Sequence, residues 1–234
     1  MKDKYIRGLR IDWSAVAEDS YLRGISALSG VDELEFGSNI TFLVGENGSG
    51  KSTLLEAIAV AFGFNAEGGT LNYRFSTYND VSPLNKAMTL VKGVSRPKQG
   101  YFFRAETFFN VATVGATKYM GDDYHTQSHG EGFLSFMSGF DGAGLYLIDE
   151  PEAALSPQRQ LSLLRFIYES ARNGSQFIIA THSPILLACP SARILSFDNG
   201  RIAPCDYEDT ESYRITKMFM ERKDVILDEL LYRD

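Results

Sequence analysis

The sequence predicts an α/β fold with a mainly parallel sheet covered by helices on both faces. Apolar runs of strand length alternate along the chain with stretches of helical periodicity, the pattern of strands buried between two helical layers. The chain has 234 residues, of which 44% are hydrophobic and 23% charged, enough for a full core in a globular protein. Disordered, collagen-like and disulfide-stapled chains are thereby excluded, and residues 1–234 are expected to form one domain.

In the first half of the chain, strands are expected at residues 31–36 and 40–44, and a buried helix at 50–62. Residues 63–79 are rich in Gly, Asn, Ser and Tyr, which is typical of a loop. A further short strand is expected at 101–104.

In the second half, an apolar strand at 144–148 ends in two acidic residues, and another strand is expected at 177–180. Between them, Ser156 is expected to cap a helix through its side chain, with Pro157 in the first turn. Gly174 lies just past the end of this helix.

Asn199-Gly200 predicts a hairpin between strands at 194–197 and 201–204. After the hairpin, residues 211–231 have the pattern of one or two short amphipathic helices.

The composition also bears on compartment and partners. No apolar run of the kind a secretory signal needs follows the first four residues, and the longest uncharged span, 173–192, is too polar and too interrupted by proline to cross a bilayer. Cys189 and Cys205 have no metal-ligand spacing and are expected to be reduced thiols. We therefore expect a cytoplasmic protein without membrane insertion. The net charge of −7 argues against a protein whose whole surface binds nucleic acid, although it leaves room for a local basic patch.

A phosphate-binding motif stands between a strand and a helix. Residues 45–52 read Gly-Glu-Asn-Gly-Ser-Gly-Lys-Ser and match G-x-x-x-x-G-K-[ST] at every fixed position. Glycines let successive N–H groups face phosphate oxygens, and the helix N-terminus adds partial positive charge. The expected nucleotide-binding residues are Gly45, Glu46, Asn47, Gly48, Ser49, Gly50, Lys51, Ser52 and Thr53.

The strand at 144–148 ends in a pair of carboxylates. Asp149 is expected to hold Mg²⁺ together with the Ser52 hydroxyl, as in the Walker B arrangement. Glu150 follows directly, so its side chain is expected on the other side of the strand, where it can act as general base on an attacking water.

With these motifs, the stretch from Val31 to about Phe197 resembles the ABC-type ATPases, and more closely their compact, stand-alone RecF/SMC/OLD-like branch. Ala180-Thr181-His182-Ser183 resembles the switch-histidine loop. Glu152-Ala153-Ala154-Leu155-Ser156 resembles the D-loop, with Ser156 where the family usually has Asp. Ser128-His129-Gly130-Glu131-Gly132 resembles a degenerate signature motif in which Ser128 and Gly130 match.

The resemblance implies a P-loop fold with an antiparallel β portion and a small helical or irregular arm at about residues 64–140. It implies ATP and Mg²⁺ as ligands, Lys51 and Glu150 as catalytic residues, and His182 on the γ-phosphate. It also implies that Ser128 and Gly130 act on ATP held by a second chain, so that two copies form a head-to-tail homodimer around two Mg–ATP.

The segment between Phe64 and Gln127 helps to distinguish which branch of the family the chain resembles. A transporter ATPase has a Gln at the end of a strand here, whereas this chain has Glu106 after the strand at 101–104. Glu106 is placed at the Q-loop position as a ligand of Mg²⁺ or water, and Gln99, which precedes the strand, is the competing candidate. The alternative interpretation, in which Glu106 is an exposed acid after a strand without a role in binding, has almost as much support.

A basic stretch lies in the same segment. Residues 72–120 carry seven basic side chains and two acidic ones, interleaved with aromatic residues. Basic groups neutralise phosphates and aromatic rings stack on bases, so nucleic acid is a candidate partner beside protein. We favour a different interpretation of this stretch, in which the basic residues belong to a solvent-exposed arm and the aromatic residues pack in the core.

The expected function is an ATP-hydrolysing switch that acts on a partner outside the membrane, either nucleic acid or protein. One alternative is the ATP-binding subunit of an ABC transporter. Another is a nucleotide-gated binding module with little turnover, against which the Asp149-Glu150 pair argues, because such a module needs no base. A small-molecule kinase would leave His182 and the signature-like segment unexplained.

Overall fold

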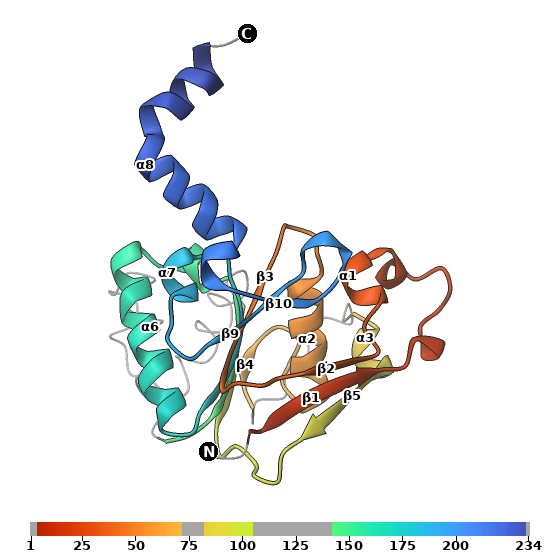
Figure 1. The fold of residues 1–234 in the computed structure, drawn as a ribbon. Helices are drawn as coiled ribbons and strands as arrows, with labels where there is room; N and C mark the ends of the chain where they lie inside the picture. Colours follow the sequence, from red (N-terminus) through yellow and green to blue (C-terminus); the bar gives the residue numbers. More distant parts are fainter. Residues whose placement is uncertain (1–3, 72–81, 105–141, 233–234) are drawn as a thin grey trace.

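The computed structural model describes residues 4–71, 82–104 and 142–232. Within these residues, the central sheet has seven strands in the order β10-β9-β3-β8-β7-β6-β4 (Figure 1). Five neighbouring strands, from β9 to β6, run parallel, and β10 and β4 are antiparallel at the two edges. The strands are β3 (Ile40–Val44), β4 (Gly69–Thr70), β6 (Gly100–Arg104), β7 (Leu145–Asp149), β8 (Gln176–Ala180), β9 (Arg193–Ser196) and β10 (Ala203–Cys205).

The predicted fold class is confirmed, and the sequence explains the core of the sheet. All residues of β3, β7 and β8 are buried, as expected for strands whose side chains are apolar on both faces. Their registers align Phe42 with Ile179 and Leu147 with Ile178. Because these strands are parallel, the loops that follow them emerge at the same edge of the sheet.

Helices cover both faces of the sheet (Figure 1). Helix α2 (Lys51–Phe62) packs on one face together with Leu43, Leu147 and Ile178. On the other face lie α6 (Pro157–Arg172) and the short α7 (Pro184–Leu187). There the Tyr146 and Phe177 rings stack with centroids 4.8 Å apart, a geometry that adds to their burial.

A second, antiparallel sheet lies over α2 and has the order β2-β1-β5. Its strands are β1 (Ile6–Ile11), β2 (Glu33–Glu35) and β5 (Met88–Lys92). The buried Gln176 amide joins β1 to the central sheet, because it accepts from Ile6 N at 2.9 Å and donates to Ile6 O at 2.7 Å. Short helices complete this part: η1 (Trp13–Ala15), η2 (Tyr21–Gly24), α1 (Ser26–Ser29) and α3 (Leu84–Ala87).

Two local expectations were wrong. The strand expected at 31–36 is limited to β2, because Val31 already closes a turn by donating its N–H to Leu28 O. Ser156 precedes α6, but its side chain makes no capping hydrogen bond. The side chain of Gln160, inside the helix, instead donates to Leu155 O at 3.0 Å.

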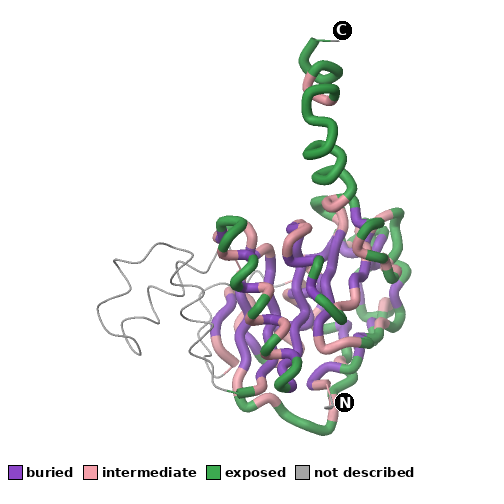
Figure 2. The backbone as a smooth tube through the Cα atoms, turned by 60° about the vertical axis from the view of Figure 1, so that its left-hand side comes forward, coloured by how far each residue is buried: buried purple, intermediate pink, exposed green. Residues whose placement is uncertain are grey.

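The C-terminal segment forms α8 (Glu211–Tyr232), one element of 22 residues that is interrupted at Arg222, where φ is −131° and ψ is 30°. No residue of α8 is buried, and the element projects from the body of the molecule (Figures 1 and 2). The expectation of one or two short helices thus corresponds to two helical stretches joined without a loop. Among helices in the described ranges, none combines the length and the apolar content needed to cross a bilayer.

The remaining turns contain η4 (Pro151–Ala154), η5 (Asp198–Gly200) and η6 (Tyr207–Asp209). The hairpin between β9 and β10 is confirmed, and both Asn199 (φ 57°) and Gly200 (φ 69°) adopt positive φ in its turn. Of the arm expected at about 64–140, the described parts are 64–71 and 82–104, whose strands belong to the two sheets.

Candidate nucleotide-binding and hydrolysis site

The phosphate-binding motif forms the loop between β3 and α2. Its glycines are required by the backbone, since φ is 141° at Gly45 and 99° at Gly50. Space is also limiting at Gly50, where a Cβ atom would come within 2.7 Å of the Ile25 side chain. The loop therefore has the curled backbone expected of a phosphate cradle at a helix N-terminus.

Lys51 begins α2 and is 4% exposed. Its Nζ donates to Gly45 O at 2.7 Å and to Glu46 O at 2.9 Å, which holds the cation across the loop. Desolvation lowers the pKa of Lys51, and the nearby carboxylates, Glu150 first, act in the opposite direction. The loop thus carries one cation, whose desolvation an anionic ligand would offset.

Ser52 and Asp149 meet across the first turn of α2 and the end of β7. The Ser52 hydroxyl donates to Asp149 Oδ1 at 3.0 Å, and Asp149 is buried. A hydroxyl and a carboxylate at this spacing fit the ligand set of Mg²⁺, which binds one or two protein oxygens and takes its other ligands from water and phosphate. The described residues contain no group of three His, Cys, Asp or Glu side chains that could hold a metal ion by themselves.

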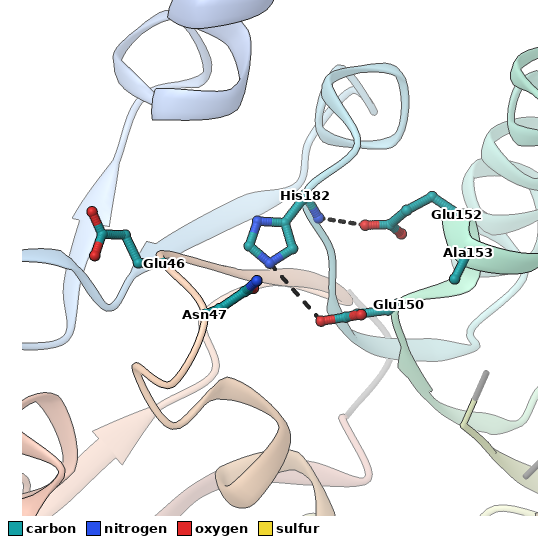
Figure 3. Close-up of a pocket in the computed structure, with 6 residues that line it drawn as sticks. All are labelled: Glu46, Asn47, Glu150, Glu152, Ala153 and His182. Atoms are coloured by element: carbon teal, nitrogen blue, oxygen red, sulfur yellow. Dashed lines mark hydrogen bonds and ion pairs between the residues drawn. The ribbon is translucent and has the colours of Figure 1, made fainter. Parts of the chain in front are cut away.

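Glu150 adopts a left-handed backbone conformation, with φ 47° and ψ 54°. This conformation is costly for a residue with a side chain and is found most often at functional sites. Pairing of β7 with β8 fixes it, because Glu150 N donates to Ala180 O at 2.9 Å. The half-exposed carboxylate lies 3.9 Å from His182 Nε2, and Figure 3 shows the two side chains pointing toward each other.

Glu150 and His182 line a pocket of about 570 Å³. Asn47 of the phosphate loop lies beside them in Figure 3, whereas the Glu46 carboxylate points away. The loop after β3, the turn after β7 and the turn after β8 therefore meet at one edge of the sheet, as expected for a ligand site of a parallel α/β fold.

Glu152 is a functional candidate that the sequence analysis placed only by resemblance, within the D-loop. Its carboxylate accepts from the Thr181 hydroxyl at 2.7 Å and from His182 N at 2.5 Å. Hydrogen bonds to a charged acceptor are among the stronger ones in proteins. Glu152 therefore fixes the backbone of the turn after β8 that carries Thr181 and His182, a role for which the spacing of residues gave no signal.

A second bridge connects the same two loops. Ser183 donates through its hydroxyl to Gln160 Oε1 at 2.6 Å, and Gln160 Nε2 donates to Leu155 O at 3.0 Å. Ser183 also accepts from Leu186 N and so caps α7. Because these groups are buried and paired, residues 152–156 and 181–183 are held as one unit.

Asp198, in the turn after β9, supports the phosphate loop from the opposite side. Its Oδ1 accepts from Glu46 N at 3.3 Å, and its Oδ2 accepts from the Ser196 hydroxyl at 2.6 Å. The sequence analysis assigned Asp198 no role, since only the hairpin at Asn199-Gly200 was visible there.

The structure thus brings residues 45–53, Asp149, Glu150 and His182 to one edge of the sheet. Ser49 Oγ is buried there without a hydrogen-bond partner in the described part of the chain. The remaining predicted site residues, Glu106, Ser128 and Gly130, lie outside the described residues.

Two family models match parts of the chain. Residues 21–88 match a model described as "AAA domain". Residues 132–188 match one described as "AAA domain, putative AbiEii toxin, Type IV TA system". The first match contains the phosphate loop, and the second contains Asp149, Glu150 and His182.

Curated relatives include the hemin import ATP-binding protein HmuV of Streptomyces coelicolor, 28% identical over 210 residues that cover 78% of this chain and 73% of the relative. HmuV of Nocardia farcinica is 28% identical over 206 residues, covering 74% of this chain and 69% of the relative. A short stretch of 36 residues is 56% identical to structural maintenance of chromosomes protein 6A of Arabidopsis thaliana, covering 15% of this chain and 3% of that protein.

Among solved structures, the SMC head domain from Thermotoga maritima aligns with a TM-score of 0.45 and 17% identity, covering 88% of this chain and 100% of that chain. An inward-facing putative metal-chelate type ABC transporter aligns with a TM-score of 0.38 and 15% identity, covering 76% of each chain.

Proposed function

We propose that the chain is a P-loop ATPase of the AAA/ABC type, which binds Mg–ATP, hydrolyses it and acts as a nucleotide-dependent switch, and the two matching AAA family models support this. The observation that carries the proposal is the meeting of five side chains at one edge of the sheet. Lys51 supplies a cation, Ser52 and Asp149 supply metal ligands, and Glu150 faces His182 at 3.9 Å.

Each residue has a defined part in the proposed reaction. Backbone N–H groups of residues 45–51 and the Lys51 ammonium bind the phosphates. Ser52 and Asp149 hold Mg²⁺, which neutralises charge that develops on the phosphate oxygens. Glu150 accepts a proton as water attacks the γ-phosphorus and the bond to the bridging oxygen breaks, giving ADP and phosphate. His182, fixed by Glu152, contacts the γ-phosphate.

We further propose that two identical chains associate head to tail, with Ser128 and Gly130 of each chain completing the site of the other. Two-fold association is the commonest arrangement of identical chains. ATP then favours the closed pair because it contacts both chains, and hydrolysis removes that contact. The partner that this switch controls is a nucleic acid or another protein.

A second candidate function is the ATP-binding subunit of a transporter. The similarity to two proteins of hemin import favours it. A transporter subunit, unlike the proposed switch, requires partner subunits in the membrane for activity. ATP hydrolysis by the isolated chain, at a rate that added membranes do not change, would therefore support the switch.

Substitution of Glu150 by Gln tests the proposal. We expect ATP hydrolysis to fall about 100-fold or more, the usual contribution of a general base, while ATP binding is retained. Steady-state phosphate release and equilibrium binding of labelled ATP measure the two effects. Glu169→Gln, on the exposed face of α6, is the matched control and should hydrolyse ATP normally.

Hydrolysis by Glu150→Gln at the wild-type rate would remove Glu150 from the mechanism. Failure of the wild-type chain to bind ATP would contradict the proposed function as a whole.

A further inference from the structure

A second side-chain contact joins α2 to the edge of the sheet, one helical turn beyond the contact between Ser52 and Asp149. Arg104, the last residue of β6, donates through Nη1 to Glu56 Oε2 at 2.6 Å. Glu56 follows Ser52 by four residues in α2, so the two side chains share one face of the helix, with Cβ atoms about 5–6 Å apart. The function proposed above gives this Arg104–Glu56 pair no part.

The register of the sheet places the two contacts next to each other. Arg104 lies directly opposite Asp149 in the parallel pairing of β6 with β7. Residues opposite each other in paired strands point to the same face of the sheet. That face is the one covered by α2, because Phe102 and Leu147, two residues earlier in each strand, pack in the same core cluster as the apolar residues of α2. Arg104 therefore meets α2 beside the residue that Ser52 meets.

The Arg104–Glu56 pair is largely buried and held in one arrangement. The exposed fractions of the two side chains are 22% and 12%. The other carboxylate oxygen of Glu56 accepts from Ser82 N at 3.0 Å, and Arg104 Nη1 also donates to Ala66 O at 3.3 Å. Because desolvation offsets much of the attraction between buried charges, we expect the pair to add little net stability and to act mainly on geometry.

The two contacts differ in what a metal ion would do to them. The Ser52 hydroxyl donates to Asp149 Oδ1, and these oxygens are also the ones that would serve Mg²⁺. Their direct link is weakened when they turn to the ion. The oxygens of Glu56 are not needed by the ion, so the Arg104–Glu56 pair can hold α2 at the same distance from the sheet in both states. Residues that orient metal ligands in this way contribute strongly to metal affinity.

From the shared helix face, the strand register and the burial, we propose that Arg104 and Glu56 are positioning residues for the metal site. Their ion pair fixes α2 against the ends of β6 and β7 and so sets the separation of Ser52 and Asp149. The inference rests on the proposed function, in which Ser52 and Asp149 hold Mg²⁺, and adds two residues that do not themselves contact the ion.

The test measures how far Mg²⁺ strengthens ATP binding. The Mg²⁺ effect is the ratio of the ATP dissociation constant in EDTA to that in Mg²⁺, both from equilibrium binding. Arg104→Met should lower this ratio about tenfold, the lower end of the loss when a residue that orients a metal ligand is removed. The dissociation constant in EDTA should stay within about twofold of wild type, because the phosphate loop is unchanged. Arg104→Lys keeps the charge and should retain most of the ratio.

The double variant Arg104→Met/Glu56→Gln separates positioning from stability. It leaves no uncompensated buried charge, so the urea midpoint of the nucleotide-free protein should recover most of what Arg104→Met loses. The Mg²⁺ effect should stay low, because α2 is still not tied to β6. Arg10→Met is the matched control, since it breaks the exposed Arg10–Glu33 pair of the second sheet, and it should change neither measurement.

A Mg²⁺ effect of wild-type size in Arg104→Met, or one that recovers together with stability in the double variant, would overturn the positioning role and leave the proposed function intact. If Arg104→Met does not fold, the double variant decides by the same measurement. A wild-type chain that binds ATP equally well in EDTA and in Mg²⁺ would instead contradict the proposed metal site, and the positioning role with it.

Discussion

Glu150 combines a proposed role as general base with an unfavourable backbone conformation. Its φ of 47° is one of three positive values at non-glycine positions in the described residues, the others being Ser191 and Asn199. Asn199 tolerates the left-handed region well, whereas a glutamate gains nothing from it. The strain at Glu150 is therefore best explained by the position it gives the carboxylate beside His182.

Relief of this strain is measurable. Glu150→Gly should raise the free energy of unfolding by about 0.5–1 kcal/mol, the left-handed cost of about 1–2 kcal/mol less the added chain entropy of glycine. Hydrolysis should be lost at the same time. Urea denaturation of the nucleotide-free protein measures the change. Glu150→Gln keeps the Cβ atom and should leave stability near wild type, so equal stability of the two variants would argue against stored strain.

At the scale of elements, two turns at the edge of the sheet behave as one unit. Glu152 in η4 accepts two hydrogen bonds from the turn after β8, and Gln160 of α6 accepts another from Ser183. Each turn carries one of the two side chains that face each other in the pocket, Glu150 in one and His182 in the other. Their separation is therefore set by Glu152 rather than by the flexible side chains that face the pocket.

Glu152→Gln should slow turnover about tenfold, because an amide oxygen can replace only one of the two carboxylate acceptors and the loss of about 1.4 kcal/mol is a tenfold effect. The dissociation constant of ATP should change less than twofold. Separate measurement of kcat and of ATP binding distinguishes this from a general loss of structure. Thr181→Ser keeps the donated hydroxyl and should be nearly normal, and a parallel loss of binding and turnover in Glu152→Gln would contradict the positioning role.

The elements differ in how far the sequence could predict them. Strands β3 and β8 and helix α2 were placed within one residue of their ends, because the strands are short apolar runs and the apolar residues of the helix recur at helical spacing. Strand β5 was not predicted, since its burial alternates irregularly and its pairing with β1 joins residues some 80 positions apart. Glu152 and Asp198 were missed as contacts for a related reason, since their partners are distant in sequence and partly backbone groups.

At the scale of the whole molecule, the free energy of unfolding should depend on pH in the alkaline range. The reason is that several thiol and phenol groups are buried in their neutral form. Burial raises the pKa of Cys189 to about 11 and that of Tyr146 to about 12, and it also raises the pKa of Tyr101. In the unfolded chain these groups ionise near their ordinary values of 9 to 10. Because these groups ionise more readily in the unfolded chain, raising the pH favours unfolding. Their contribution to the stability of the folded protein is therefore complete below about pH 9 and is lost as the pH rises toward their pKa values in the folded protein.

We therefore expect the free energy of unfolding to fall as pH rises from 8 to 10.5, measured by urea denaturation at each pH. Lys51, whose pKa is lowered by desolvation, acts in the opposite direction but is one group against several thiols and phenols whose pKa is raised. Cys189→Ala should flatten the slope, while Cys205→Ala, at a more exposed thiol, should change it less. A stability that is constant over this range would contradict the assignment.

The contact of Gln176 with Ile6 has a consequence for synthesis of the chain on the ribosome. The two hydrogen bonds join residues that are 170 positions apart. At the usual pace of translation, the amide that anchors the first strand emerges on the order of ten to thirty seconds after that strand. Pairing with β2 and β5 becomes available earlier, so the small sheet can form before Gln176 joins it to the central sheet.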